Sequence, residues 1–218
     1  LFESIYLNYN PSEKKENQIL WEVQLDTTVD FKPKVTVNHV NFANEIFFQD
    51  HANNIYLIDN KGNILWKKQL TDPIVSEVYQ IDVYNNNKLQ YLFNTTTALY
   101  LVDRKGRYVE GYPVKFPYLA TNGIAVLDYD KERDYRILVA LEGGLIYNYD
   151  RFGKTVKGWK FKGSDDITYP IKHFVLNGKD YIVALTETGI PYVLNRRGEV
   201  RLKLKSRVPL SPENEYFL

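Results

Sequence analysis

The chain has 218 residues, of which 28 are basic, 27 are acidic and 44% are apolar, and its net charge is +1. This composition excludes an intrinsically disordered or collagen-like chain, and the balanced charge gives no electrostatic reason to expect nucleic acid or an anionic membrane as a partner. No apolar run approaches the ~18 residues of a membrane span. Cysteine is absent, which excludes disulfides and thiolate metal sites in this stretch.

The chain begins with residues 1–25, which we expect to supply the last two strands of one repeat, because Ile19-Leu20-Trp21 recurs 45 residues later as Ile64-Leu65-Trp66. Four later segments share a tyrosine, an Asp or Asn, and a glycine in constant register. They are Ile55–Gly62, Leu99–Gly106, Ile146–Gly153 and Pro191–Gly198. Their glycines are separated by 44, 47 and 45 residues, and a period of this length is typical of β-propeller blades.

Each repeat is predicted to hold four short strands joined by polar turns. In the second repeat the predicted strands are Ile74–Val83, Leu89–Phe93, Leu99–Asp103 and Tyr108–Phe116. Inner strands such as Ile137–Leu141 are apolar at every position, which predicts a sheet covered on both faces. Stacked propeller blades meet that condition. A β-sandwich or another all-β repeat is the alternative, although a sandwich favours a cleaner alternation of apolar and polar residues.

The predicted fold class is therefore all-β: a β-propeller of four-stranded antiparallel blades, with about 45 residues per repeat, forming a single domain over 1–218. We expect a partial blade at 1–25, full blades at about 33–70, 73–116, 119–161 and 169–206, and a partial blade at 207–218. The two ends either share one closing blade in a small ring or belong to an arc of a larger ring. The absence of methionine favours a fragment of the larger ring.

The segment Leu57–Trp66 reads LIDNKGNILW and resembles the repeat of quinoprotein-like (PQQ-like) propellers, in which an Asp precedes a turn ending in Thr-Gly and a Trp docks between blades. Here the turn is one residue shorter and lacks the Thr, the Trp is replaced after Gly106 and Gly198, and Trp159 is offset by two positions. The resemblance implies the propeller architecture.

Quinoprotein-like propellers divide into dehydrogenases that hold a quinone and calcium, and non-enzymatic scaffolds. The scaffolds include the propeller lipoprotein of the bacterial outer-membrane barrel-assembly machinery. This sequence lacks the cysteine pair that covers the quinone in many of those dehydrogenases, so the resemblance favours the scaffold branch. The Asn- and Lys-rich turns suggest a Bacteroidetes-type bacterium as the source.

Asp128, Asp130 and Asp134 are the candidate metal ligands, because carboxylates at alternate positions can wrap one calcium ion. The loop also resembles the calcium-binding repeats of integrin-type propellers. Those loops carry Gly at the sixth position, where this chain has Arg133. A solvated hairpin turn is the alternative, and no cofactor other than this calcium is predicted.

The three histidines, His39, His51 and His173, lie in different repeats with no carboxylate or second histidine at ligand spacing. His39 and His173 fall on predicted first strands, which line the channel of a propeller. A channel ligand is one interpretation, and ordinary hydrogen-bonded histidines are the other. Gly153-Lys154-Thr155 lacks the preceding glycine and the following helix of a phosphate loop, and no Gly-x-Ser-x-Gly elbow occurs.

Arg201, Lys203 and Lys205 alternate with leucines, which gives one strand a basic face. That face either attracts an acidic partner or prevents edge-to-edge pairing of an outermost strand. Asn94-Thr95-Thr96 matches a glycosylation acceptor. The three tryptophans are predicted to pack between blades rather than to form a ligand cage; they are Trp21, Trp66 and Trp159.

The predicted function is a non-enzymatic scaffold for protein–protein interactions in the bacterial cell envelope, in the periplasm or at the outer membrane. Its expected partners are proteins, without nucleic acid and without a membrane span in this stretch. The alternative is a ligand-binding or enzymatic propeller whose channel site holds a metal, quinone or carbohydrate, partly outside this stretch. A carbohydrate-binding surface module is a third interpretation, suggested by the 18 tyrosines. Fold alone does not decide among these functions.

Overall fold

The computed structural model describes residues 20–29, 31–204 and 206–209. Most of the predicted partial blades at 1–25 and 207–218 lies outside the described residues, as does Lys205. The described residues are strands, turns and loops, and none of them forms a helix that could span a membrane. The chain packs as two compact units, Leu1–Pro73 with Arg104–Arg107, and Ile74–Asp103 with Tyr108–Leu218.

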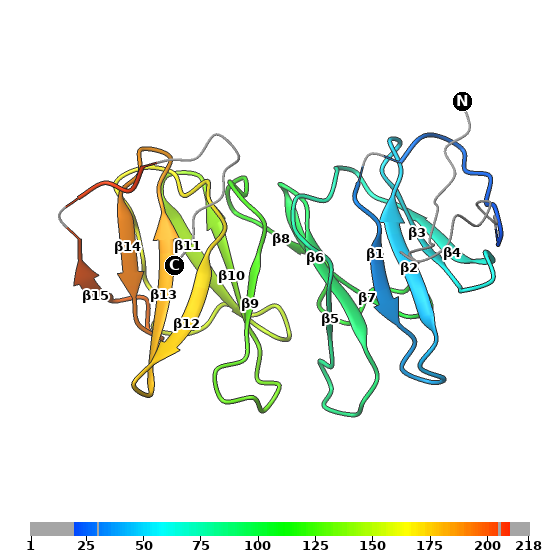
Figure 1. Cartoon of the computed structure of the whole chain (residues 1–218). Coiled ribbons are helices and arrows are strands. Elements are labelled where there is room, and N and C mark those ends of the chain that lie inside the picture. Colours follow the sequence, from blue (N-terminus) through cyan, green and yellow to red (C-terminus); the bar gives the residue numbers. More distant parts are fainter. Residues whose placement is uncertain (1–19, 30, 205, 210–218) are drawn as a thin grey trace, which may run out of the picture. The chain divides into compact units, whose positions relative to one another are not determined.

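The first unit contains one four-stranded antiparallel sheet, the first blade, with the strand order β1-β2-β3-β4 (Figure 1). Its strands are β1 (Lys34–Val37), β2 (Asn44–Gln49), β3 (Asn54–Ile58) and β4 (Ile64–Gln69). One face of the sheet buries Ile46, Phe48, Tyr56 and Ile58. The segment before the sheet covers that face with Trp21, Val23, Leu25 and Val29.

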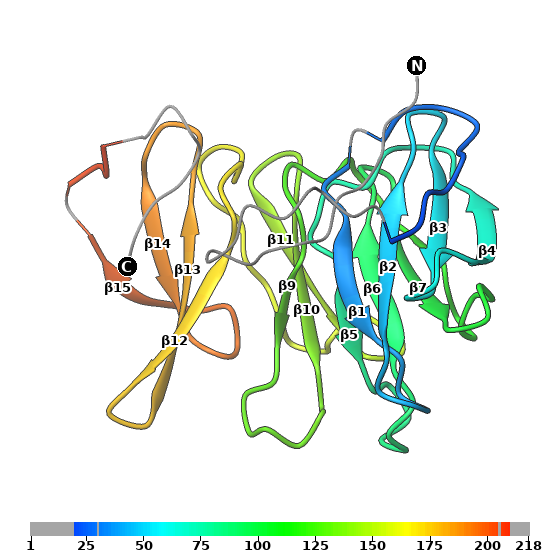
Figure 2. The same ribbon diagram turned by 45° about the vertical axis from the view of Figure 1, so that its right-hand side comes forward.

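The second unit contains three antiparallel sheets, which follow one another in chain order in both views (Figures 1 and 2). The second blade is β5 (Tyr79–Ile81), β6 (Gln90–Asn94), β7 (Ala98–Asp103) and β8 (Val114–Lys115). The third blade is β9 (Ala125–Leu127), β10 (Arg136–Leu141) and β11 (Leu145–Asp150). The fourth blade is β12 (Lys172–Leu176), β13 (Lys179–Leu185), β14 (Pro191–Leu194) and β15 (Val200–Lys203).

Strand β10 shows why the inner strands are apolar at every position. Side chains alternate between the two faces of a strand. Ile137, Val139 and Leu141 pack in a cluster with the second blade, whereas Leu138 and Ala140 pack in a cluster with the fourth. All five side chains are fully buried. The sheet is therefore covered on both faces, as predicted for stacked blades and not for a sandwich.

The Asp and Gly of the repeat shape the turn between the third and fourth strands of a blade. The Asp59 carboxylate accepts the backbone N–H groups of Lys61 and Asn63, each at 2.9 Å. Gly62 has a φ of 85°, a left-handed conformation that disfavours residues with a Cβ. Asp150 caps the corresponding turn of the third blade in the same way.

Tryptophans pack against two of these glycines in the first unit. A Cβ atom built on Gly62 would lie 3.0 Å from the ring of Trp21, and one built on Gly106 would lie 2.9 Å from the ring of Trp66. The Trp66 indole N–H also donates to the Arg104 carbonyl oxygen at 2.9 Å. The repeat glycine is therefore required both by the turn and by the ring that lies on it.

Tyr112 replaces this tryptophan between the second and third blades. A Cβ atom on Gly153 would lie 2.5 Å from Val114 and 3.4 Å from the Tyr112 ring. The Tyr112 hydroxyl donates to the Arg151 carbonyl at 3.1 Å. Trp159 lies in turn on Gly198, where a Cβ would be 3.1 Å from its ring. The tryptophans therefore pack between neighbouring repeats, as predicted.

The outermost strands of the second and third blades differ from the prediction. Only Val114–Lys115 of the predicted strand Tyr108–Phe116 forms β8, and the third blade has three regular strands. Gly111 and Gly158, each with a φ of 86°, turn the outer segment away from its neighbour. The alternating pattern of these segments resembles a strand, so the pattern alone does not reveal the bulge.

Candidate functional site

The Asp128 side chain caps the turn between β9 and β10. Its carboxylate oxygens accept the backbone N–H groups of Glu132 and Arg133 at 3.0–3.1 Å. Arg133 has a φ of 62°, so it adopts the left-handed conformation for which calcium loops use glycine. The Arg133 guanidinium in turn donates to Asp82 in the second blade and to Asn87 at 2.9 Å.

The other two candidate calcium ligands pair with arginines. The Asp130 carboxylate accepts hydrogen bonds from both terminal nitrogens of Arg196, at 2.9 and 3.1 Å. Asp134 Oδ2 lies 2.9 Å from Arg136 Nη2. The three aspartates are thus engaged with three different sets of partners. Within the described ranges no three His, Asp or Glu side chains form a group suited to a metal ion. Calcium binding at this loop stays a prediction.

His173 has a carboxylate partner that the sequence analysis missed. Its Nε2 lies 2.8 Å from Asp180 Oδ1. The β12–β13 ladder pairs His173 with Ile182 and Val175 with Asp180, so the two side chains are diagonal neighbours on one face of the hairpin. The expectation that no carboxylate lies close to a histidine was wrong for His173, because spacing along the chain does not show which residues a hairpin brings together.

Tyr129, Asp130, His173, Asp180 and Arg196 form a cluster between the third and fourth blades, which we call the Tyr129 cluster. Arg196 donates to Asp180 as well as to Asp130, and its guanidinium carbon lies 4.6 Å from the centre of the Tyr129 ring. The rings of Tyr129 and His173 meet edge to face with their centres 5.4 Å apart. The cluster joins two blades with one cation, two carboxylates and two aromatic rings.

Tyr129 carries an unpaired polar atom in this cluster, since its hydroxyl oxygen is buried without a hydrogen-bond partner. Burial raises the pKa of Tyr129, and the negative charge of Asp180 raises it further, while Arg196 opposes both effects. The hydroxyl therefore stays protonated at neutral pH. A ligand with a hydrogen-bond acceptor or donor would satisfy it.

The Asp180 carboxylate predicts a pH dependence of stability. Burial raises its pKa, but the hydrogen bonds from His173 and Arg196 and their charges outweigh that effect, so the pKa lies below its usual value. Stability from this depressed pKa is present above the unfolded value, about pH 4, and is lost as pH falls toward the folded value. We expect Asp180→Asn to lower the free energy of unfolding by about 1–2 kcal/mol at pH 7.

Urea titrations at neutral and acidic pH test this expectation. The curves of the native protein and Asp180→Asn should converge as the pH falls below about 4. The matched control is Glu132→Gln on the exposed β9–β10 turn, which should match the native protein throughout. A constant difference between Asp180→Asn and the native protein at every pH would contradict the assigned role.

Of the remaining predicted positions, Asn94 has a structural role. Asn94 is fully buried, donates to the Thr95 carbonyl at 2.9 Å and accepts the Ile124 N–H at 2.9 Å, so it is not an accessible glycosylation acceptor. His39 lies in the turn after β1 rather than on the strand, and His51 is exposed. The segment after Gly153 forms a turn and an isolated bridge, not the helix of a phosphate loop.

The basic strand predicted at Arg201, Lys203 and Lys205 corresponds in part to β15, which includes the first two residues. The guanidinium of Arg201 lies 5.1 Å from the centre of the Tyr181 ring on β13. One of the three predicted cations therefore packs on the face of its own sheet. Whether this strand attracts an acidic partner stays a prediction.

Solved structures similar to this chain are propellers. BBS1N, solved in complex with ARL6DN, matches with a TM-score of 0.62 and 14% identity over 83% of this chain and 59% of that one. BamB from Moraxella catarrhalis matches with a TM-score of 0.53 and 16% identity over 87% of this chain and 57% of that one. The Neurospora crassa Pan2 WD40 domain matches with a TM-score of 0.52 and 15% identity over 79% of this chain and 49% of that one.

This chain has a β-propeller fold. The predicted fold class is confirmed by the stacked antiparallel sheets and by these matches. The chain spans 59% of the length of BBS1N, and all three identities are too low to carry more than the fold. No family model matches the sequence, and no curated protein matches it.

Proposed function

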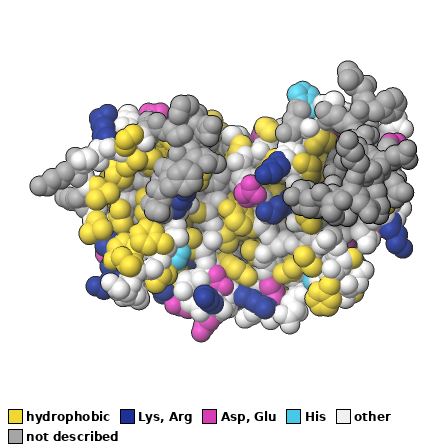
Figure 3. All heavy atoms as spheres, in the orientation of Figure 1, with side chains coloured by type: hydrophobic (Ala, Val, Ile, Leu, Met, Phe, Trp, Pro, Cys, Tyr) yellow, Lys and Arg dark blue, Asp and Glu magenta, His cyan; other side chains and the backbone are white. Residues whose placement is uncertain are grey.

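We propose that this protein is a non-enzymatic scaffold that holds a protein partner, in the bacterial cell envelope. The observation that carries the proposal is an apolar surface on the fourth blade (Figure 3). On β12, Phe174 is 37% and Leu176 54% exposed, and on β15 Leu202 is 48% exposed. The strand pairing places these three side chains on the same face of the sheet. Contiguous apolar side chains at a protein surface mark sites of protein contact.

The charged groups of the described residues support a structural frame rather than a reaction site. Glu45 pairs with Arg104, Asp82 with Arg133, and Asp130 and Asp180 with Arg196. For Asp82 and Asp180 the net effect is a lowered pKa, although burial by itself raises it. A carboxylate with a lowered pKa is a poor general base at neutral pH. All of these pairs except Asp180 with Arg196 join neighbouring repeats.

Affinity purification of the full-length protein from fractionated cells of its source tests the proposal. We expect one partner at near-equal amount, recovered from the envelope fraction. Phe174→Lys combined with Leu176→Lys should reduce its recovery at least about ten-fold, because charged residues in a buried apolar contact remove central binding energy. Val35→Lys on β1, where the side chain is 52% exposed, is the matched control and should not change recovery.

Recovery of the protein without a partner at comparable amount would contradict the scaffold function. Recovery of a partner from the cytosolic fraction alone would contradict the envelope setting but not the scaffold.

The Tyr129 cluster favours a second candidate function, a binding site for a small ligand, metal or carbohydrate. The supporting observation is the buried Tyr129 hydroxyl without a partner, next to a His–Asp pair. Native mass spectrometry of the purified protein tests this candidate. A bound species that is present in the native protein and lost in Tyr129→Phe would support the ligand site, and identical spectra would contradict it.

A further inference from the structure

The second and third blades share an unusual outer segment. In the second blade, Val102 of β7 pairs with Tyr108, and Ala98 of β7 pairs with Lys115. Three residues of β7 lie between these two pairs, but six residues of the outer segment do, so the outer segment bulges out of the sheet. In the third blade, Tyr149↔Thr155 and Leu145↔Lys162 enclose three residues of β11 and again six. We call residues 108–115 the second-blade bulge and residues 155–162 the third-blade bulge. The two can be compared position by position.

The third-blade bulge leaves a hollow beside β11. A cavity of about 580 Å³ is lined by residues 145–148 of β11 and by the bulge. The Trp159 side chain supplies a hydrogen bond to β11 where the bulge interrupts the strand pairing, because its indole N–H donates to the Ile146 carbonyl oxygen at 2.7 Å. A volume of this size accommodates a few side chains or a short extended segment.

Asn148 is the polar residue that distinguishes this blade. It lines the cavity, is 3% exposed, and its Oδ1 is buried with no hydrogen-bond partner. The equivalent positions of the other repeats are apolar and buried: Leu57, Leu101 and Val193. An unsatisfied buried carbonyl oxygen costs about 1–3 kcal/mol, so a ligand that supplies a donor there gains from satisfying it.

The third-blade bulge is also strongly basic. Residues 151–163 contain five cationic side chains and no carboxylate, although the whole chain has a net charge of +1. Lys157, Lys160 and Lys162 line the cavity, and among the described residues no hydrogen bond or ion pair engages their ammonium groups. The positions of the second-blade bulge that correspond to Lys157 and Lys160 hold Glu110 and Pro113, and only the position of Lys162 is again basic, as Lys115. Two of the three lysines are therefore particular to the third-blade bulge.

We propose that the cavity under the third-blade bulge binds an acidic peptide segment of the protein partner. The inference rests on the scaffold function proposed above and names the chemistry of the segment. A peptide supplies backbone N–H groups for Asn148 Oδ1, carboxylates for the three lysines, and apolar groups for the half-buried Trp159 ring. A balanced overall charge disfavours nucleic acid, for which a broad basic surface is typical.

Fluorescence anisotropy with the whole protein tests the site. The probe is a fluorescein-labelled, N-acetylated peptide of alternating Glu and Gly residues at low salt. Lys157→Glu combined with Lys160→Glu should weaken binding at least about ten-fold, because two attractions become repulsions. Asn148→Leu should weaken it about three- to ten-fold through one lost hydrogen bond, without lowering the midpoint of thermal unfolding. Lys115→Glu in the second-blade bulge is the matched control, with an expected change below about two-fold.

Three results would overturn the inference. They are absence of peptide binding, equal weakening by Lys115→Glu, and equally tight binding of single-stranded DNA that Asn148→Leu does not change. The last result would show that the lysines attract any polyanion. Failure here is distinguishable from failure of the scaffold function, because a partner at near-equal amount in the purification would leave the scaffold intact and place its contact elsewhere.

Discussion

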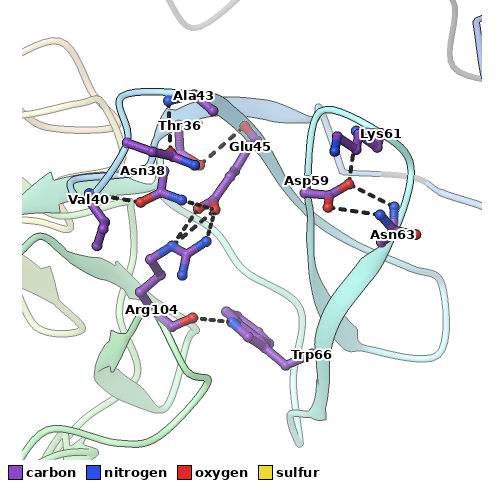
Figure 4. Close-up of polar contacts among 11 residues, drawn as sticks. Thr36, Asn38, Val40, Ala43, Glu45, Asp59, Lys61, Asn63, Trp66 and Arg104 are labelled. Atoms are coloured by element: carbon purple, nitrogen blue, oxygen red, sulfur yellow. Dashed lines mark hydrogen bonds and ion pairs between the residues drawn. The ribbon is translucent and has the colours of Figure 1, made fainter.

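Replacing Arg104 with methionine is expected to lower the free energy of unfolding by about 3 kcal/mol. Arg104 donates through Nε, at 3.0 Å, and Nη2 to the carboxylate of Glu45, whose side chain is 1% exposed (Figure 4). Asn38 Nδ2 donates to the same carboxylate at 3.0 Å. Removal of the arginine takes the guanidinium partner from a buried carboxylate, which is far costlier than the loss of an exposed ion pair.

Urea unfolding at neutral pH measures the effect of Arg104→Met. Arg197→Met, at an exposed position of the last repeat turn, is the control and should change stability by less than about 0.5 kcal/mol. Adding Glu45→Gln to Arg104→Met should recover much of the loss, because the uncompensated charge is removed. Equal stability of Arg104→Met and Arg197→Met would contradict the importance of this pair.

Gly106→Ala is expected to cost about 3 kcal/mol in total, of which about 1–2 kcal/mol comes from the left-handed backbone and the rest from overpacking. Gly106 has a φ of 76°, and its new Cβ would lie 2.9 Å from Trp66 Cδ2. Gly178→Ala is the matched control: its φ is 70°, but a Cβ there meets nothing within 4 Å. Only the backbone cost should appear at Gly178.

A double-mutant cycle separates the two contributions at Gly106. In a Trp66→Ala background the ring is absent, so Gly106→Ala should cost only the backbone term of about 1–2 kcal/mol. The same cost in both backgrounds would contradict direct packing of the Trp66 ring on the turn.

The fold was predictable because both the turn residues and the apolar strands of the repeat indicate it. Asp59 and Gly62 mark a turn that needs a side-chain cap and a left-handed residue, and the structure contains both. The uniformly apolar strand Ile137–Leu141 has neighbours on both faces. Local turn chemistry and burial pattern therefore agree with the architecture, as they do when a sequence specifies one fold.

The contacts between repeats were less predictable. Trp66 lies four residues after Gly62, whereas Tyr112 lies six residues after Gly106. The two differ in chemistry as well, yet each donates to a carbonyl of the next turn. The pairing of Arg104 with Glu45 spans 59 residues. No local pattern encodes such contacts, because they depend on the register of neighbouring sheets.

The candidate sites show the same limit. Asp128, Asp130 and Asp134 alternate along the chain, but arginines from other positions pair with two of them and a turn uses the third. Asn148 was visible in the sequence as the polar exception among Leu57, Leu101 and Val193. Comparison of the repeats at that one position was the signal that could have led to the third-blade cavity.

The central claim is that the third and fourth blades hold a protein partner, and site-specific photocrosslinking in cells of the source organism tests it most directly. Benzoylphenylalanine would replace Lys160 beside the cavity, Leu176 on β12, or Val35 on β1 as the control. We expect one and the same crosslinked protein from Lys160 and Leu176 and none from Val35. No crosslink at either of the first two positions, or the same products at all three, would contradict it.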